Sequence, residues 1–349
     1  MMNKNTFQEL EELILPVLKT KNVPFIQGKP GVGKSTLAKK VADKFELLLI
    51  DIRLSTFDPT MFNGFLWFDG DRAGFKTLDL FPIEGDELPI NPKTNKPYKG
   101  WLILLDEFTQ VPKPMEGAAF QLILDRKVGT KNLHDKAFCM CAGNPVGQGM
   151  IAKPISTPMR SRLIHYELEN TVPSFTPTMI EIGFHSTIVN YINCYPDMIN
   201  NFESNHSNLD GTYACERSWE MLSDILNEIE KKTKVEQKHL STLIGAVGVT
   251  AGNGIYTFLQ NYYASPNIKT IVQDPENLPI PSSMQEQYAC ISYILENTTL
   301  TNGKHIATYL KRFPEEFQLI FGRILLSKNE ELFDAEFKFL MQLVVKYAI

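Results

Sequence analysis

Eight residues near the start of the chain have the types and spacing needed to hold a nucleotide phosphate. They run from Gly28 to Ser35 and match the pattern G-x-x-x-x-G-K-[ST] in full. Glycines let the backbone curl so that successive N–H groups point at phosphate oxygens, and the helix start that follows adds partial positive charge. Lys34 is expected to reach the β- and γ-phosphates, and the Ser35 hydroxyl to coordinate Mg²⁺. The sequence therefore predicts that ATP and Mg²⁺ bind at Gly28, Lys29, Pro30, Gly31, Val32, Gly33, Lys34, Ser35 and Thr36.

Two adjacent acids, Asp106 and Glu107, end an apolar run that starts at Trp101. Asp106 could hold Mg²⁺ directly or through water, and Glu107 could orient or deprotonate an attacking water. Apolar runs often end in acids where a strand reaches solvent, so this pair gains its meaning from the phosphate loop. A small-molecule kinase needs no water-activating carboxylate here, whereas an ATPase does. Asp106 and Glu107 together therefore favour hydrolysis of ATP over phosphoryl transfer to a small molecule.

A third polar group, Asn144, follows another apolar run in the segment Cys141-Ala142-Gly143-Asn144-Pro145. An amide at this place can hydrogen-bond the γ-phosphate or the attacking water without adding charge. The alternative is a plain turn, because Asn-Pro is a common turn initiator. The order of the three motifs along the chain favours the first role, in which Asn144 senses hydrolysis through its hydrogen bond to the γ-phosphate or the water.

Alternating strand-like and helix-like stretches must position these residues. Helices are expected at 34–45 and 114–126, and strands at 23–27, 47–52, 101–105, 138–142 and 163–168. This alternation predicts an α/β fold with a parallel sheet covered by helices on both faces. Residues 56–100 are rich in Gly, Pro, Asp and aromatic residues, which predicts a surface insertion with a hairpin around Asp69-Gly70.

Beyond Glu169 the strand signals stop. Helices are expected at about 177–191, 217–232, 237–247, 252–263, 284–297 and 330–347. The sequence therefore predicts a nucleotide-binding domain over 1–169 and a helical domain over 170–349. Four aromatic residues at helical spacing near its middle are expected in a core or a subunit interface rather than in a base-stacking platform: Tyr256, Phe258, Tyr262 and Tyr263.

Composition narrows the function classes. A net charge of −5 argues against a protein whose main grip is on nucleic-acid phosphates. The five cysteines lack metal-ligand spacing, and Cys139 and Cys141 alternate in an apolar run as buried thiols would. An odd cysteine count without a signal peptide favours a reducing, cytoplasmic compartment. No apolar run approaches the length of a membrane span, so no membrane insertion is expected.

The motif order and spacing over about Val23 to Leu168 resemble those of the AAA+ ATPases, and within them the MoxR-like branch, which is similar to midasin and McrB-type modules. Further segments add to the resemblance. They are Arg53-Leu54-Ser55 with Asp58-Pro59 and Gly64, Leu105 to Phe108, and Asp125 to Gly129. The branch carries its insertion where residues 56–100 lie. The chain departs from MoxR proteins in having Ser161-Arg162, a form found in some other AAA+ clades, instead of an acidic-Asp-Arg-Phe ending.

The resemblance implies roles that spacing alone does not. Arg162 falls where the family places an arginine finger that reaches the nucleotide of a neighbouring subunit, with Arg160 as the alternative. Arg217 falls where the family has a sensor arginine acting in cis on the lid, which the helical domain would form. An oligomeric ring, most simply a hexamer, would then remodel a protein client, with a von Willebrand factor A-type partner as a family expectation. A DNA-directed motor or restriction-type NTPase, a small-molecule kinase and a nucleotide-gated scaffold remain as alternatives.

Overall fold

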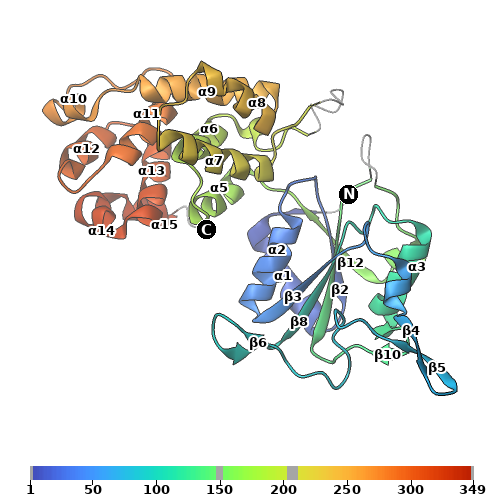
Figure 1. Ribbon diagram of the computed structural model, residues 1–349. Helices are drawn as coiled ribbons and strands as arrows, with labels where there is room; N and C mark the ends of the chain where they lie inside the picture. Colours follow the sequence, from blue (N-terminus) through green and yellow to red (C-terminus); the bar gives the residue numbers. More distant parts are fainter. Residues whose placement is uncertain (1–2, 147–151, 203–210, 347–349) are drawn as a thin grey trace. The chain divides into compact units, whose positions relative to one another are not determined.

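The computed structural model describes residues 3–146, 152–202 and 211–346. The chain divides into two compact units, Met1–Asn170 and Thr171–Ile349, here called unit 1 and unit 2. Unit 1 is an α/β layer structure and unit 2 is helical (Figure 1).

Unit 1 is built on a six-stranded sheet whose strand order is β1-β12-β2-β11-β8-β3. Every neighbouring pair in it is parallel. The predicted fold class is therefore confirmed, and all five predicted strands belong to this sheet. The strands are β1 (Lys4–Asn5), β2 (Val23–Gln27), β3 (Leu47–Arg53), β8 (Gly100–Asp106), β11 (Ala137–Gly143) and β12 (Leu163–Leu168).

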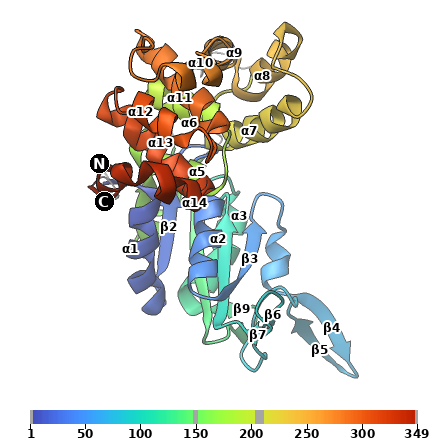
Figure 2. The same cartoon turned by 90° about the vertical axis from the view of Figure 1, so that its left-hand side faces the viewer.

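Helices cover both faces of this sheet (Figure 1, Figure 2). One face packs against α1 (Phe7–Lys19) and α2 (Lys34–Lys44), and the other against α3 (Lys113–Asp125) and the short α4 (Thr157–Arg160). Strand β11 alternates between the two cores, with Cys139 and Cys141 toward α3 and Met140 toward α2. The two thiols are buried as predicted, and burial raises the pKa of Cys139 to about 11.

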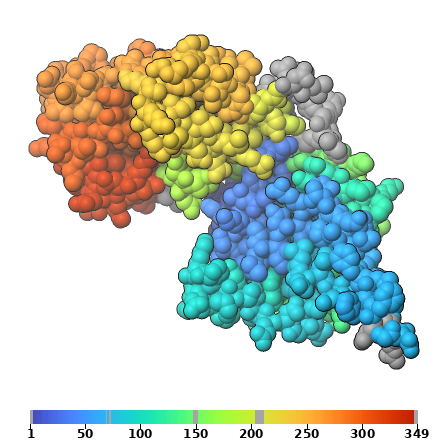
Figure 3. All heavy atoms as spheres, in the orientation of Figure 1, coloured from blue at the N-terminus to red at the C-terminus, as the bar shows by residue number. Residues whose placement is uncertain are grey.

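The segment between β3 and β8 contains the predicted hairpin. Its strands are β4 (Phe65–Asp69) and β5 (Arg72–Lys76), with Gly70 and Asp71 at the turn. This hairpin lies at the surface of unit 1 (Figure 3), and more than half of the Trp67 and Phe68 side chains is exposed. A one-turn helix (Pro59–Phe62) lies in the same segment. Unit 1 has two shorter hairpins, one in this segment and the other between α3 and β11. These hairpins pair β6 (Ile90–Asn91) with β7 (Lys96–Pro97), and β9 (Lys127–Val128) with β10 (Lys131–Asn132).

Unit 2 packs its helices around one hydrophobic core. Phe258 and Tyr262 are buried in this core, and Tyr256 and Tyr263 pack against it, so all four have a core role. In the described residues no helix is long and apolar enough to cross a membrane. The helices are α5 (Val172–Glu181), α6 (Ser186–Cys194), α7 (Glu216–Glu230), α8 (Leu240–Val247), α9 (Val249–Tyr263), α10 (Ile268–Gln273), α11 (Met284–Asn297), α12 (Gly303–Leu310), α13 (Glu315–Lys328), α14 (Glu330–Leu332) and α15 (Met341–Lys346).

Two helix predictions in unit 2 are wrong in detail. The helix expected over 177–191 is two helices, α5 and α6, because Gly183 takes a left-handed φ of 80° between them. His185 then caps α6 by accepting a hydrogen bond from the Thr187 N–H. The helix expected over 330–347 changes to a π-turn at Phe333–Phe337 and a 3₁₀ turn at Lys338–Leu340 before α15. Tyr347 lies outside the described residues.

Candidate nucleotide-binding site

The glycine loop joins the carboxyl end of β2 to the start of α2. Gly31 and Gly33 have φ values of 80° and 95°, a region that L-residues rarely adopt. Gly28 has a different reason for being glycine, since a Cβ there would lie 2.8 Å from the Leu168 carbonyl oxygen. The N-cap residue of α2 is Gly33, which has no side chain to cap the helix, and this leaves the first N–H groups of α2 for a ligand.

Lys34 lies across this loop. Its Nζ donates hydrogen bonds to the carbonyl oxygens of Gly28 and Lys29, at 2.8 and 3.0 Å. It also donates to Oδ1 of Asn144 at 2.9 Å. The structure thus brings together the lysine of the loop and the amide that follows β11. An incoming phosphate would have to replace these contacts with its own oxygens.

Ser35 and Asp106 form the second contact between motifs. The Ser35 hydroxyl donates to Oδ2 of Asp106 at 2.9 Å, and Oδ1 of Asp106 accepts the Glu107 N–H at 2.8 Å. Mg²⁺ binds oxygen ligands at about 2.1 Å in an octahedron, so two neighbouring ligand oxygens lie about 3 Å apart. The separation of the hydroxyl and carboxylate oxygens matches that edge. The donor set therefore fits Mg²⁺ held by both residues, directly or through water.

Glu107 adopts an unusual backbone conformation next to this pair. Its φ is 59°, in the left-handed region, which costs a non-glycine residue about 1–2 kcal/mol. Its carboxylate accepts a hydrogen bond from the Ser55 hydroxyl, just past the end of β3. Neither the conformation nor the Ser55 contact was expected from the sequence. Because β3 and β8 are neighbours in the sheet, residues that follow both strands meet at this edge.

Thr109 fixes the position of Asn144. Its Oγ1 accepts a hydrogen bond from the Asn144 N–H at 3.0 Å and donates one to the Asn144 carbonyl at 2.9 Å. Thr109 is buried, and a Cβ at Gly143 would lie 2.9 Å from it, so only glycine fits beside it. Thr109 is thus a positioning residue that the sequence did not reveal. Its only signal is its place three residues after Asp106.

Negative charge gathers at this edge of the sheet. Asp51, on β3, has a raised pKa, chiefly because of burial and next because of the neighbouring charge of Asp106. The positive charge of Arg53, which is opposite Asp106 in the sheet register, acts against this rise. A field of this sign favours a divalent cation.

The three predicted arginines lie apart from these contacts. Arg162 donates from Nη1 to the Pro158 carbonyl at 2.7 Å, and its guanidinium lies 5.0 Å from the ring centre of Phe120. Arg160 ends α4, and its carbonyl accepts a hydrogen bond from His165 Nε2 at 2.9 Å. Arg217 belongs to unit 2, where it is an exposed residue in the first turn of α7.

The sheet order and the loop together are those of a P-loop NTPase fold. No protein-family model and no curated protein matches the chain. Among solved structures, it is similar to a candidate ATPase of Cytophaga hutchinsonii, with 12% identity and a TM-score of 0.33 over 91% of this chain and 80% of the other. It is also similar to NtrX of Brucella abortus (14%, TM-score 0.36, over 79% of this chain) and to a RuvB variant of Thermotoga maritima (15%, TM-score 0.35, over 80% of this chain and 81% of the other). The chain spans 61% of the length of NtrX.

Proposed function

We propose that the chain is a Mg²⁺-dependent ATPase of the AAA+ type, related to the MoxR-like branch, which converts ATP and water to ADP and phosphate. One observation supports this most directly. At the carboxyl edge of the sheet, Lys34 contacts Asn144 and Ser35 contacts Asp106, while Glu107 follows directly. A phosphate cradle, a metal-ligand pair and a water-activating carboxylate are the parts that hydrolysis of a nucleoside triphosphate needs.

In the proposed mechanism, the loop amides and Lys34 hold the β- and γ-phosphate oxygens once Lys34 has left Asn144. When bound between Ser35 and Asp106, Mg²⁺ would supply charge neutralisation at the same oxygens. Glu107 orients a water and accepts its proton as the water oxygen bonds to the γ-phosphorus. The bond from that phosphorus to the β–γ bridging oxygen breaks, and ADP leaves with the electron pair. Asn144 contacts the γ-phosphate or the water.

The assembly is the further part of the proposal. Arg162 would act in trans, exchanging the Pro158 carbonyl for a phosphate oxygen of the neighbouring subunit, which suits a guanidinium because its fork pairs with two oxygens. Arg217 would act in cis from the helical lid. Activity would then depend on an oligomeric ring, which would use hydrolysis to remodel a protein client. The hexamer and the von Willebrand factor A-type partner stay as expectations from the resemblance.

The test is the ATPase rate as a function of protein concentration. We expect specific activity to rise with concentration in the wild type and to be lost in Glu107→Gln, which should still bind ATP. Arg162→Ala should lose activity, whereas Lys39→Ala, an exposed change on α2, should not. Concentration-independent activity together with an active Arg162→Ala variant would refute the ring.

The same assays separate the rival functions. Stimulation of the rate by DNA would favour a DNA-directed motor. A phosphorylated small molecule in place of free phosphate would establish a kinase. ATP binding by the wild type without any turnover would indicate a nucleotide-gated scaffold.

A further inference from the structure

A cavity of about 460 Å³ lies in unit 1 on the sheet face that carries α3 and α4. Its volume is in the range of small-molecule sites. It lies on the opposite face of the sheet from α2, and the P-loop residues 28–35 do not line it. Six residues define its chemistry: Phe25, Gln27, Thr109, Ile155, Arg160 and His165.

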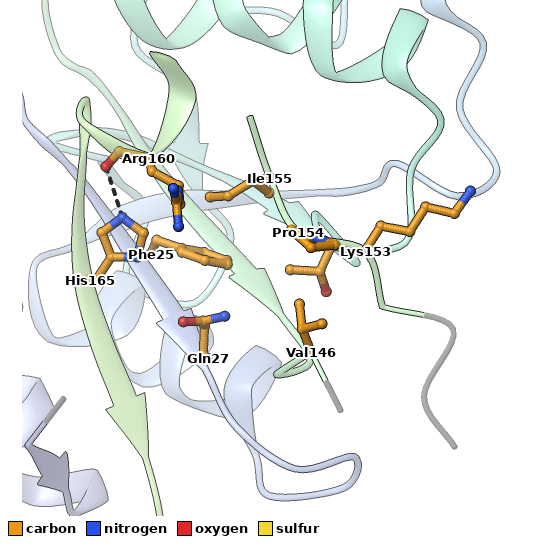
Figure 4. A pocket seen from close by; sticks show the side chains of 9 residues that line it. Phe25, Gln27, Val146, Lys153, Pro154, Ile155, Arg160 and His165 are labelled. Atoms are coloured by element: carbon orange, nitrogen blue, oxygen red, sulfur yellow. Dashed lines mark hydrogen bonds between the residues drawn. The ribbon is translucent and has the colours of Figure 1, made fainter. Parts of the chain in front are cut away.

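The charged and polar groups of this cavity are suited to an anion. Figure 4 shows the Arg160 guanidinium extending toward the ring of Phe25, with the Gln27 amide on the other side of that ring. His165 is fixed from two sides, because its Nε2 donates to the Arg160 carbonyl at 2.9 Å and its ring packs edge-on against Phe25 at 5.4 Å. No aspartate or glutamate is among the described residues that line the cavity. A cation without a lining acid favours a ligand that brings its own carboxylate.

The rest of the wall is apolar. Phe25 is fully buried beneath the cavity, and Val146, Pro154 and Ile155 are its other apolar lining residues. Lys153 also lines the cavity, but its side chain runs away from the other labelled residues (Figure 4). The wall would thus accept the body of a ligand whose charged end pairs with Arg160.

We propose that this cavity binds a small monocarboxylate with an aromatic or branched apolar body. The carboxylate pairs with the Arg160 guanidinium, while the body packs against Pro154 and Ile155. This use of Arg160 within its own subunit leaves Arg162 as the arginine for a subunit contact.

The cavity is connected to the nucleotide site through one residue. Thr109 lines it, and its hydroxyl holds both backbone groups of Asn144, whose Oδ1 accepts from Lys34. An occupant that packs on Thr109 favours this arrangement, in which Lys34 is engaged by Asn144 instead of phosphate. The ligand and ATP therefore weaken each other's binding by the same factor. This link rests on the proposed function, whereas the site itself does not.

Calorimetric titration of the full chain with phenylacetate tests the site. We expect one saturable site with a Kd of about 1 mM or tighter, as for a good ligand of this size. Phenylacetamide, which lacks the charge, and acetate, which lacks the apolar body, should bind much more weakly. Because Arg160 is exposed, Arg160→Gln should weaken phenylacetate binding about twofold to fivefold, as loss of an exposed ion pair predicts. Lys153→Gln, the matched control, should change it little.

Equal binding of the amide, an unchanged Kd in Arg160→Gln, or no binding to the wild type would overturn the site. The link is tested in the Glu107→Gln background, where saturating Mg²⁺ and ATP should raise the Kd of phenylacetate at least about twofold. Thr109→Val should keep phenylacetate binding and lose this shift. A Kd that ATP leaves unchanged would overturn the link. Because phenylacetate binding is measured without turnover, absence of ATPase activity would count against the proposed function alone.

Discussion

Glu107 offers a test that separates the strain of its backbone from the chemical role of its carboxylate. Both Glu107→Ala and Glu107→Gly remove the carboxylate and its hydrogen bond from Ser55, so they differ only in the backbone. The left-handed φ of 59° costs alanine about 1–2 kcal/mol. Glycine avoids that strain but loses about 0.5–1 kcal/mol through its greater freedom in the unfolded chain. The glycine variant should therefore be about 0.5–1 kcal/mol more stable than the alanine variant.

Hydrogen exchange of the β8 amides is a suitable assay, because an interior strand paired on both sides exchanges through unfolding of its whole unit and reports unit 1 alone. Lys39, exposed in the middle of α2, is the matched control, where the order should reverse and alanine be favoured by about 1 kcal/mol. Both Glu107 variants should hydrolyse ATP at least about 100-fold more slowly than the wild type. If Glu107→Ala were as stable as Glu107→Gly, the strained backbone would be refuted.

Three further predictions follow from the charged groups. Asp106→Asn should weaken Mg²⁺ binding in the presence of ATP at least tenfold by titration, about the loss of one charged ligand. Asp51→Asn should stabilise unit 1 by about 0.5 kcal/mol at pH 7, a small gain because the side chain is partly exposed. Since the pKa of Asp51 is raised, this gain should vanish as the pH falls below its ordinary value of 3.8, where both folded and unfolded chains are protonated. In unit 2, burial opposes ionisation of Glu230, but hydrogen bonds from His185 and Tyr263 prevail and lower its pKa. Glu230→Gln should lower the free energy of unfolding by about 1–2 kcal/mol above pH 4.5, and this difference should be lost as the pH falls through the lowered pKa, as urea unfolding against pH would measure.

The strands of unit 1 could be predicted because parallel strands are buried on both faces and form continuous apolar runs. Leu163–Leu168 and Val23–Gln27 have the predicted bounds, and three other strands extend by one or two residues. The first helix was missed, although Thr6 and Glu9 form a capping box at its start. Its Pro16 interrupts the pattern by which helices are usually recognised.

The candidate site was predictable only where residue type carries the chemistry. Lys34, Ser35 and Asp106 stand in motifs, but Ser55 and Thr109 act through hydrogen bonds set by strand register and the turn after β8. A serine or threonine in a connection has no pattern that marks such a role. The left-handed Glu107 is equally hidden, because glutamate is not among the residue types enriched in that conformation.

The support of the glycine loop by Leu168 and Asn170 has a consequence during synthesis. The Leu168 carbonyl closes against Gly28, and the buried Asn170 amide donates to the Val32 carbonyl at 3.1 Å. The two-residue strand β1 likewise pairs with β12, Lys4 with Glu167 and Asn5 with Leu168. A nascent chain therefore carries the loop long before it carries the residues that brace it. We expect ATP to bind the emerging chain, and thereby to stabilise its folded state, only after residue 170 has left the ribosome.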